Sequence, residues 1–244
     1  MILLNMYVGN PTTKIEKMKM ESEKLFTNEI IVKISGCLLF NGIKTEELSA
    51  LLNCMHSKII ELDKNEIIMQ EGKVFDKLGI LLEGKAQIVQ YDYLGNRTII
   101  STVEPSEIFG EAFSYTKTKL PVNIEAVQKC RVLFLISDRI SNPCPNGCVF
   151  HKQLINNLLH ILAHKNVNLT QKIECMSKRT TKEKLLTFLS LESIKQNSKE
   201  FTISLDRQAL ADYLGVERSA MSAELSKLRK EEIIECEKNS FKLL

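Results

Sequence analysis

The stretch from residue 149 to residue 177 most limits how this chain can fold. It contains neither Gly nor Pro over 29 residues, so nothing in it interrupts a helix. Within it, apolar side chains and one Asn recur at alternating spacings of four and three residues: Ile155, Leu159, Leu162, Asn166, Leu169, Ile173 and Met176. This heptad pattern predicts a helix that pairs with a second copy, with a paired Asn166 fixing the register. The alternative is a single amphipathic helix that lies on its own core.

The segment before this helix, from Lys58 to Ile136, has a different pattern. Short apolar-alternating runs (IIEL, EIIMQ, LGILLEG, AQIVQY, RTIISTV and VLFLI) are separated by turn signals such as Glu71-Gly72 and Glu83-Gly84. Strands at such regular spacing predict an antiparallel sandwich or roll. Helical spacing appears only in short pieces between about Glu29 and Ser57. The expected fold class is therefore α+β.

The last part of the chain has the signals of a helix-turn-helix. Thr180 and Glu183 form a capping box for one helix. Asp206 caps a second helix that contains the small Ala211, and Gly215 breaks that helix. Residues 217–230 then form a third helix with Met221, Leu225 and Leu228 facing inward. A small residue and a Gly four positions later suit two helices joined by a tight turn, and the tail around Lys238-Asn239 suits a wing hairpin. A generic helical hairpin is the alternative.

In such a motif the first residues of the second helix reach base edges, and flanking cations hold phosphates. The candidates for base contacts are Glu217, Arg218, Ser219 and Ser222. Arg218 is the best of them for a bidentate contact to guanine. The candidates for phosphate contacts are Lys178, Arg179, Lys182, Arg207 and Gln208.

Composition limits the remaining possibilities. The 244 residues fit two modest domains, and the net charge of +3 is too small to identify an anionic partner. Residues 178–244 hold thirteen Lys/Arg against eleven Asp/Glu, so the prediction of DNA binding depends on where the charges lie. Seven cysteines, no signal peptide and no long apolar run predict a soluble cytoplasmic protein without a membrane partner. No catalytic motif is present, which predicts that the chain is not an enzyme.

One cysteine motif has several possible roles. Cys144, Cys148 and His151 form C-x3-C-x2-H beside the start of the long helix. Thiolates and an imidazole in one loop could hold zinc, or an iron–sulfur cluster if Cys37 or Cys130 approached. The alternatives are a redox-formed pair between Cys144 and Cys148, and a loop with reduced thiols and no special role.

On these residues the chain resembles the CRP/FNR family of transcription regulators. The residues that show the resemblance are the two EG turns, FGE at 109–111, the seam helix and the motif at 206–234. The resemblance implies an N-terminal cyclic-nucleotide-binding-like antiparallel β-roll, a long dimerisation helix and a C-terminal winged helix-turn-helix. It assigns residues 1–28 to a leader, 29–148 to the roll, 149–177 to the dimerisation helix and 178–244 to the DNA-binding domain. Double-stranded DNA, a second copy of the chain and RNA polymerase are the partners that it implies.

The chain departs from the family pattern at two sites. Members that bind cyclic nucleotides carry an Arg for the cyclic phosphate, and Leu120 or Pro121 falls at that position. Cyclic AMP is therefore not the expected effector, although Lys117 or Lys119 could replace the Arg as a point charge. The effector pocket implied by the resemblance comprises Gly110, Glu111, Ala112, Lys119, Leu120 and Pro121.

The second departure lies in the recognition helix. Ser219 and Ala223 stand where members that read the commonest half-sites have an acidic residue and a second Arg, so a different operator is expected. A competing hypothesis makes the chain a metal- or ligand-binding sensor that acts mainly through protein contacts.

Overall fold

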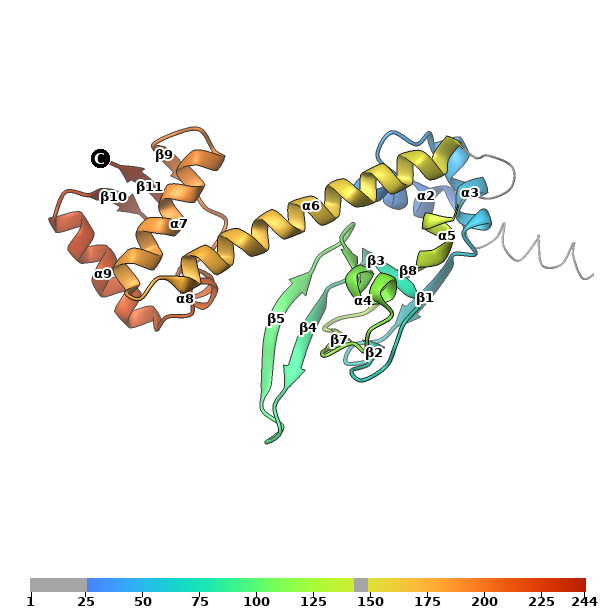
Figure 1. Ribbon diagram of the computed structural model, residues 1–244, viewed down its shortest axis with the longest axis horizontal. Coiled ribbons are helices and arrows are strands. Elements are labelled where there is room, and N and C mark those ends of the chain that lie inside the picture. Colours follow the sequence, from blue (N-terminus) through green and yellow to red (C-terminus); the bar gives the residue numbers. More distant parts are fainter. Residues whose placement is uncertain (1–25, 143–148) are drawn as a thin grey trace, which may run out of the picture. The chain divides into compact units, whose positions relative to one another are not determined.

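A computed structural model describes residues 26–142 and 149–244 of the chain (Figure 1). It divides into two compact units: unit 1 extends to Ile161, and unit 2 covers Leu162–Leu244. Most of the expected leader and both Cys144 and Cys148 lie outside the described residues. No helix within the described ranges is both long and apolar enough to cross a membrane.

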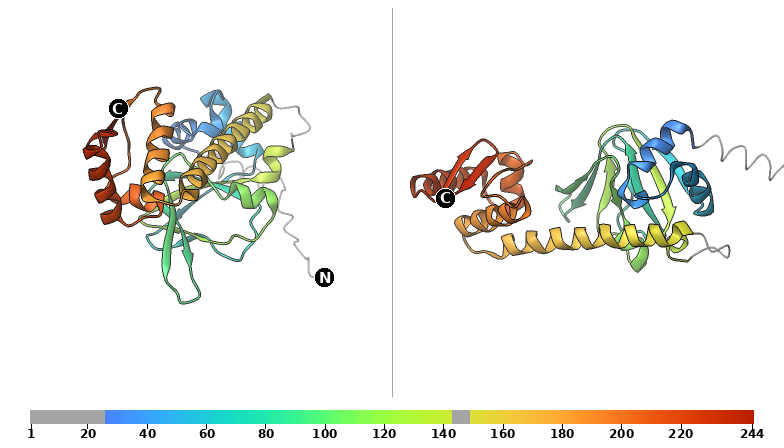
Figure 2. Two further views of the ribbon diagram at one scale, coloured as in Figure 1. Left: turned by 60° about the vertical axis from the view of Figure 1, so that its left-hand side comes forward. Right: turned by 90° about the horizontal axis from the view of Figure 1, so that it is seen from above.

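Unit 1 is built around two antiparallel sheets, each with four strands among its described residues. The first sheet has the order β1-β8-β3-β6 and comprises β1 (Lys58–Leu62), β8 (Cys130–Ile136), β3 (Lys77–Glu83) and β6 (Ile108–Phe109). The second has the order β2-β7-β4-β5 and comprises β2 (Ile67–Met69), β7 (Asn123–Ala126), β4 (Ala86–Tyr91) and β5 (Arg97–Val103). The β4–β5 hairpin projects from the rest of this roll (Figure 2). The predicted antiparallel roll is confirmed.

The core of the roll forms from side chains that alternate along these strands. Val132 and Leu81 are fully buried and Ala126 nearly so, and all three belong to one apolar cluster. Gly79 lies directly against the ring of Phe109, so that no larger residue would fit there. Four short elements were not predicted from the sequence, namely β6, β7, α4 (Glu111–Thr116) and α5 (Ser137–Ser141).

Three short helices precede the roll: α2 (Asn28–Ser35), the 3-10 helix η1 (Leu38–Phe40) and α3 (Thr45–Cys54). The helix α6 (Val149–Ser177) follows it and packs one face of its first turns on unit 1. On this face His151, Leu154, Asn157 and Leu158 are buried. The Asn157 amide donates to the carbonyl oxygens of Leu39 at 2.9 Å and Asn41 at 2.8 Å. Polar and apolar contacts together thus attach α6 to η1.

The predicted seam forms a different stripe along α6. Leu159, Leu169 and Ile173 are 60%, 61% and 66% exposed, and Met176 is 47% exposed. Asn166 is also exposed, whereas Ile155 and Leu162 are half-buried. The long helix is confirmed as predicted, and its pairing with a second copy stays a prediction.

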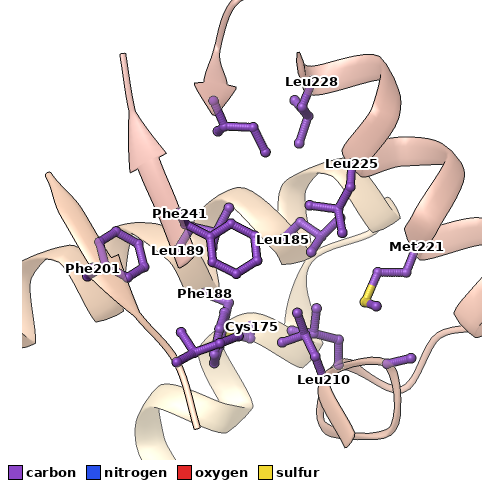
Figure 3. Packing of buried hydrophobic residues seen from close by; sticks show 14 residues of the cluster. Cys175, Leu185, Phe188, Leu189, Phe201, Leu210, Met221, Leu225, Leu228 and Phe241 are labelled. Carbon is purple, nitrogen blue, oxygen red and sulfur yellow. The ribbon is translucent and has the colours of Figure 1, made fainter. Parts of the chain in front are cut away.

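Unit 2 continues with α7 (Thr181–Lys195), β9 (Glu200–Thr202), α8 (Arg207–Leu214), α9 (Arg218–Lys230), β10 (Ile234–Glu237) and β11 (Ser240–Leu243). The strands pair antiparallel in the order β10-β11-β9. Figure 3 shows the apolar core on which these elements meet, with Cys175 from α6, Leu185 and Phe188 from α7, Leu210 from α8, Leu225 from α9 and Phe241 from the wing. The expected winged helix is confirmed.

Candidate nucleic-acid interface

The turn between α8 and α9 follows from local sequence signals. The Asp206 side chain accepts a hydrogen bond from the Ala209 N–H at 2.8 Å and so begins α8. Gly215 ends it in the left-handed region at φ 59° and ψ 50°, which costs glycine little. Ala211 is fully buried, and the Val216 N–H donates to its carbonyl oxygen at 3.0 Å. These contacts define the helix-turn-helix that the spacing predicts.

The helix α9 presents the predicted base-contacting residues to solvent. Arg218, Ser219 and Ser222 are exposed, while Met221 on the opposite face is buried. Glu217 is the N-cap residue, but its carboxylate makes no side-chain capping bond to the helix. The first two turns of α9 therefore offer one cation and short polar or apolar side chains to a ligand.

A cleft of about 640 Å³ connects α8, α9 and the wing turn. We call it the turn cleft. Its lining residues are Asp206, Arg207, Gln208, Arg218, Lys238, Asn239 and Ser240. Three of these are cations, and the one carboxylate, Asp206, is occupied as a helix cap. The turn cleft therefore suits an anion such as a phosphodiester.

A second groove of about 890 Å³ separates α9 from the wing strands, and we call it the wing groove. Ser222, Ser226 and Arg229 of α9 line one side, and Lys238 and Lys242 of the wing line the other. Glu200, Glu235 and Glu237 also border it, and Lys242 pairs with Glu235 at 3.2 Å. Its charges are mixed, so the turn cleft is the more cationic of the two.

The structure separates the predicted phosphate contacts into two groups. Arg207 and Gln208 line the turn cleft together with Arg218. Lys182 instead pairs with Glu231, the C-cap residue of α9, at 2.6 Å, and this hydrogen bond lowers the pKa of the Glu231 carboxyl. Because α9 has 13 residues, its two ends are roughly 20 Å apart. Any phosphate held by Lys182 is therefore not the one held in the turn cleft.

The remaining two phosphate candidates lie before α7. Lys178 is half-buried and Arg179 is exposed. They precede Thr180, which caps α7 in the predicted capping box. The Glu183 carboxylate accepts from the Thr180 backbone N–H at 3.0 Å, and this bond lowers its pKa. Neither cation lines the turn cleft or the wing groove.

The sequence analysis missed several residues that line these two depressions. Lys238, Asn239 and Ser240 form or flank the wing turn, and Ser226 and Arg229 lie on the later turns of α9. The signal that could have found the first group was present, because a Lys-Asn pair between two apolar strands marks an exposed hairpin turn. Only the fold shows that this turn faces the start of α8.

The expected effector pocket lies at the start of α4. Gly110 adopts a left-handed conformation at φ 74°, and Glu111, the first residue of α4, is 7% exposed. Ala112, Lys119 and Pro121 are exposed. Leu120, which stands at the expected phosphate-binding position, is 1% exposed and packs in the apolar core of the roll.

The two lysines considered as replacements for the phosphate-binding Arg lie in different surroundings. The Lys117 ammonium contacts both carboxylate oxygens of Asp138 at 3.0 Å. Lys119 forms an antiparallel bridge with Val74 through its backbone, and its side chain is exposed. Only Lys119 therefore keeps a solvent-facing ammonium that a nearby anion could approach without competing for Asp138.

Two described cysteines bear on the idea of a cluster. Burial raises the pKa of the Cys37 thiol to about 11. Burial also raises the pKa of Cys130, whose thiol donates to the carbonyl oxygens of Lys85 and Gln128 at 3.2 Å. Both are thus held as thiols rather than as the thiolates that bind metals. His151 is 2% exposed, and no group of three His, Cys, Asp or Glu within the described ranges is arranged for a metal ion.

Comparison with known proteins agrees with this architecture. A profile of the cyclic nucleotide-binding domain matches residues 59–142, and one of the Crp-like helix-turn-helix domain matches residues 183–244. The transcriptional activator protein Anr of Pseudomonas protegens is 23% identical over 184 residues, which are 72% of each chain. The CRP-like cAMP-activated global transcriptional regulator of Mycobacterium tuberculosis is 20% identical over 77% of this chain and 84% of its own. The solved structure of OCPA-complexed CprK has a TM-score of 0.58 at 16% identity, over 80% of this chain and 88% of that chain.

The roll and the winged helix-turn-helix together define a DNA-binding transcription regulator with a sensory domain of the cyclic nucleotide-binding type. The chain belongs to the CRP/FNR family.

Proposed function

We propose that two copies of the chain pair through α6 and that their two α9 helices read an inverted repeat in double-stranded DNA. The observation that supports this best is the apolar stripe on α6, where Leu159, Leu169, Ile173 and Met176 are 47% to 66% exposed in a single copy. Fully burying one such side chain contributes roughly 1.5–3 kcal/mol. Two stripes facing each other would remove these side chains from water, and paired Asn166 amides would fix the register.

In this dimer Arg218 supplies the principal base contact. It is the exposed first residue of α9, where residues of a recognition helix reach base edges. Its guanidinium fork matches the O6 and N7 atoms of guanine. Ser219, Ser222 and Glu217 supply further contacts, while the turn cleft and the cations before and at the start of α7, Lys178, Arg179 and Lys182, hold the backbone.

The effector of this regulator differs from cyclic AMP in our proposal. Leu120 lies in the apolar core at the position of the phosphate-binding Arg, and Lys117 is engaged by Asp138. An ion-paired Lys would bind a cyclic phosphate only after losing this partner, and it lacks the bidentate geometry of Arg. In the cytoplasm, RNA polymerase would be the further partner through which DNA binding acts on transcription.

The test is selection of DNA sequences from a random pool by the purified full chain at fixed salt, under aerobic and anaerobic conditions. We expect an inverted repeat with half-sites about one helical turn apart, and a dimer by sedimentation. Failure to enrich any sequence under either condition would refute the proposal. Calorimetry with millimolar cyclic AMP or cyclic GMP should show no binding heat, and a saturable heat would refute the effector part.

A further inference from the structure

Arg207, the first residue of α8, makes two contacts with the wing. Its Nη2 atom donates to the carbonyl oxygen of Lys238 at 2.7 Å. The guanidinium carbon lies 5.1 Å from the centroid of the Phe241 ring, within the range of a cation–π contact. Phe241 is 1% exposed and stacks on Phe201 with ring centroids 6.2 Å apart. Arg207 therefore connects the beginning of the helix-turn-helix to the buried floor of the wing.

The residue that Arg207 holds is in a strained conformation. Lys238 lies in the turn between β10 and β11, at φ 48°. The left-handed region costs a residue with a side chain roughly 1–2 kcal/mol. The bond from Arg207 and the bond from the Ile203 N–H to the Asn239 carbonyl oxygen, at 2.9 Å, attach this turn to the rest of unit 2. The turn thus depends on outside contacts for its shape.

We propose that Arg207 is a positioning residue for DNA binding. It holds the wing turn so that the Lys238 ammonium contacts a DNA phosphate next to the base pair read by Arg218. This inference rests on the proposed function, and it revises the expectation that Arg207 itself contacts a phosphate.

The state of the guanidinium supports the revision. Nη2 is taken up by the Lys238 carbonyl. Nη1 is enclosed by protein and has no hydrogen-bond acceptor among the described residues. The Lys238 side chain, in contrast, is exposed and lines both the turn cleft and the wing groove. The accessible cation at this place is Lys238.

A lysine at position 207 would not reproduce these contacts. An ammonium is a point charge, whereas the planar guanidinium stacks on a ring and donates sideways at the same time. The Arg207→Lys variant therefore keeps the charge and loses the positioning. This difference separates the two roles that position 207 could have.

The experiment is a double-mutant cycle on the selected operator. The affinities of the full-length wild type and the variants Arg207→Ala, Arg207→Lys, Lys238→Ala and Arg207→Ala/Lys238→Ala are measured between 50 and 200 mM salt. Loss of one phosphate contact lowers the salt slope by about 0.9, which is about a threefold to fourfold change over this range. Lys195→Ala serves as the control, because Lys195 is a cation outside both depressions.

If Arg207 acts through Lys238, both Arg207 variants and Lys238→Ala lower the slope by about one contact, and the double variant loses no more than that. Additive losses in the double variant, or wild-type binding by Arg207→Lys, would overturn the proposal. Circular dichroism melting of each variant establishes that the proteins compared are folded.

A readout without DNA separates this inference from the proposed function. Hydrogen exchange of residues 236–241 should be several-fold faster in Arg207→Lys than in the wild type, with α7 unchanged. Unchanged exchange in the wing would overturn the positioning role even if an operator is found. If no operator is found but the wing exchanges faster, the proposed function fails and the contact between Arg207 and the wing turn is upheld.

Discussion

At the scale of single residues, Arg218 is the charged side chain among the first six residues of α9. We expect Arg218→Ala to lose discrimination at one base pair of each half-site, by about 1–3 kcal/mol, because a bidentate contact to guanine is removed. Binding to operators with every substitution at each position measures this. Lys227→Ala, a cation two turns later on the same helix, should weaken binding to all sequences alike. A uniform loss in Arg218→Ala would make Arg218 a phosphate contact.

Cys37 makes the stability of unit 1 depend on alkaline pH. Its thiol is 1% exposed, and burial raises its pKa from about 9 to about 11. Because the folded state holds this proton more tightly, its contribution is complete below pH 9 and is lost as the pH rises from 9 to 11. The difference of about two pKa units corresponds to roughly 3 kcal/mol.

Denaturant unfolding of the wild type and of Cys37→Ala between pH 7 and pH 11 measures this contribution. The alanine variant starts less stable because it leaves a cavity, but it should lose less stability above pH 9. Parallel curves for the two proteins over the whole range would contradict the assignment.

At the scale of secondary-structure elements, Gly215 determines how α8 is followed by α9. A Cβ at this position would meet only the Met176 Cε at 3.6 Å, an ordinary contact, so the cost of Gly215→Ala comes from the backbone at φ 59°. That cost is roughly 1 kcal/mol, and relieving it requires the turn to change. We expect a lower Tm and at least tenfold weaker operator binding.

Gly72→Ala is the matched control, since Gly72 has φ 78° and open space around it in the roll. It should lower stability by a similar amount and leave operator affinity unchanged. Equal losses of affinity in both variants would mean that stability, rather than the geometry of the turn, limits DNA binding.

The elements that were predicted from the sequence are those whose signals are local. The Thr180 capping box, the Asp206 cap and Gly215 lie within a few residues of the helix ends that they determine. The missed elements are short, and distant partners determine them. β6 has two residues and exists because Phe109 pairs with Gly79, thirty positions earlier.

The same reasoning explains what was missed in the interface. That Arg207 lies near the DNA-binding helix followed from its place in the motif. Its bond to Lys238 could not be predicted, because the two residues are 31 positions apart and meet only after the wing has folded on α8. Charge and position in the chain identified the cations, and the fold alone shows which of them are already engaged.

At the scale of the whole molecule, the stripe on α6 determines whether the chain can bind an inverted repeat. We expect Leu169→Asp to abolish pairing, because it places two carboxylates opposite each other at a buried seam position. Leu169 is 61% exposed in the single chain, so the substitution should leave the fold of each unit intact. Sedimentation equilibrium at micromolar protein should then show a monomer.

Val167→Asp provides the matched control for this prediction. Val167 is 52% exposed on the same helix but lies outside the heptad positions, so this variant should remain a dimer with operator affinity near that of the wild type. Loss of the dimer should weaken binding to the full inverted repeat by several orders of magnitude, because the second half-site no longer benefits from a high local concentration. Binding to an isolated half-site should stay unchanged in both variants. A dimeric Leu169→Asp protein that still binds the full repeat tightly would mean that the copies pair through another surface, and that the stripe on α6 has a different partner.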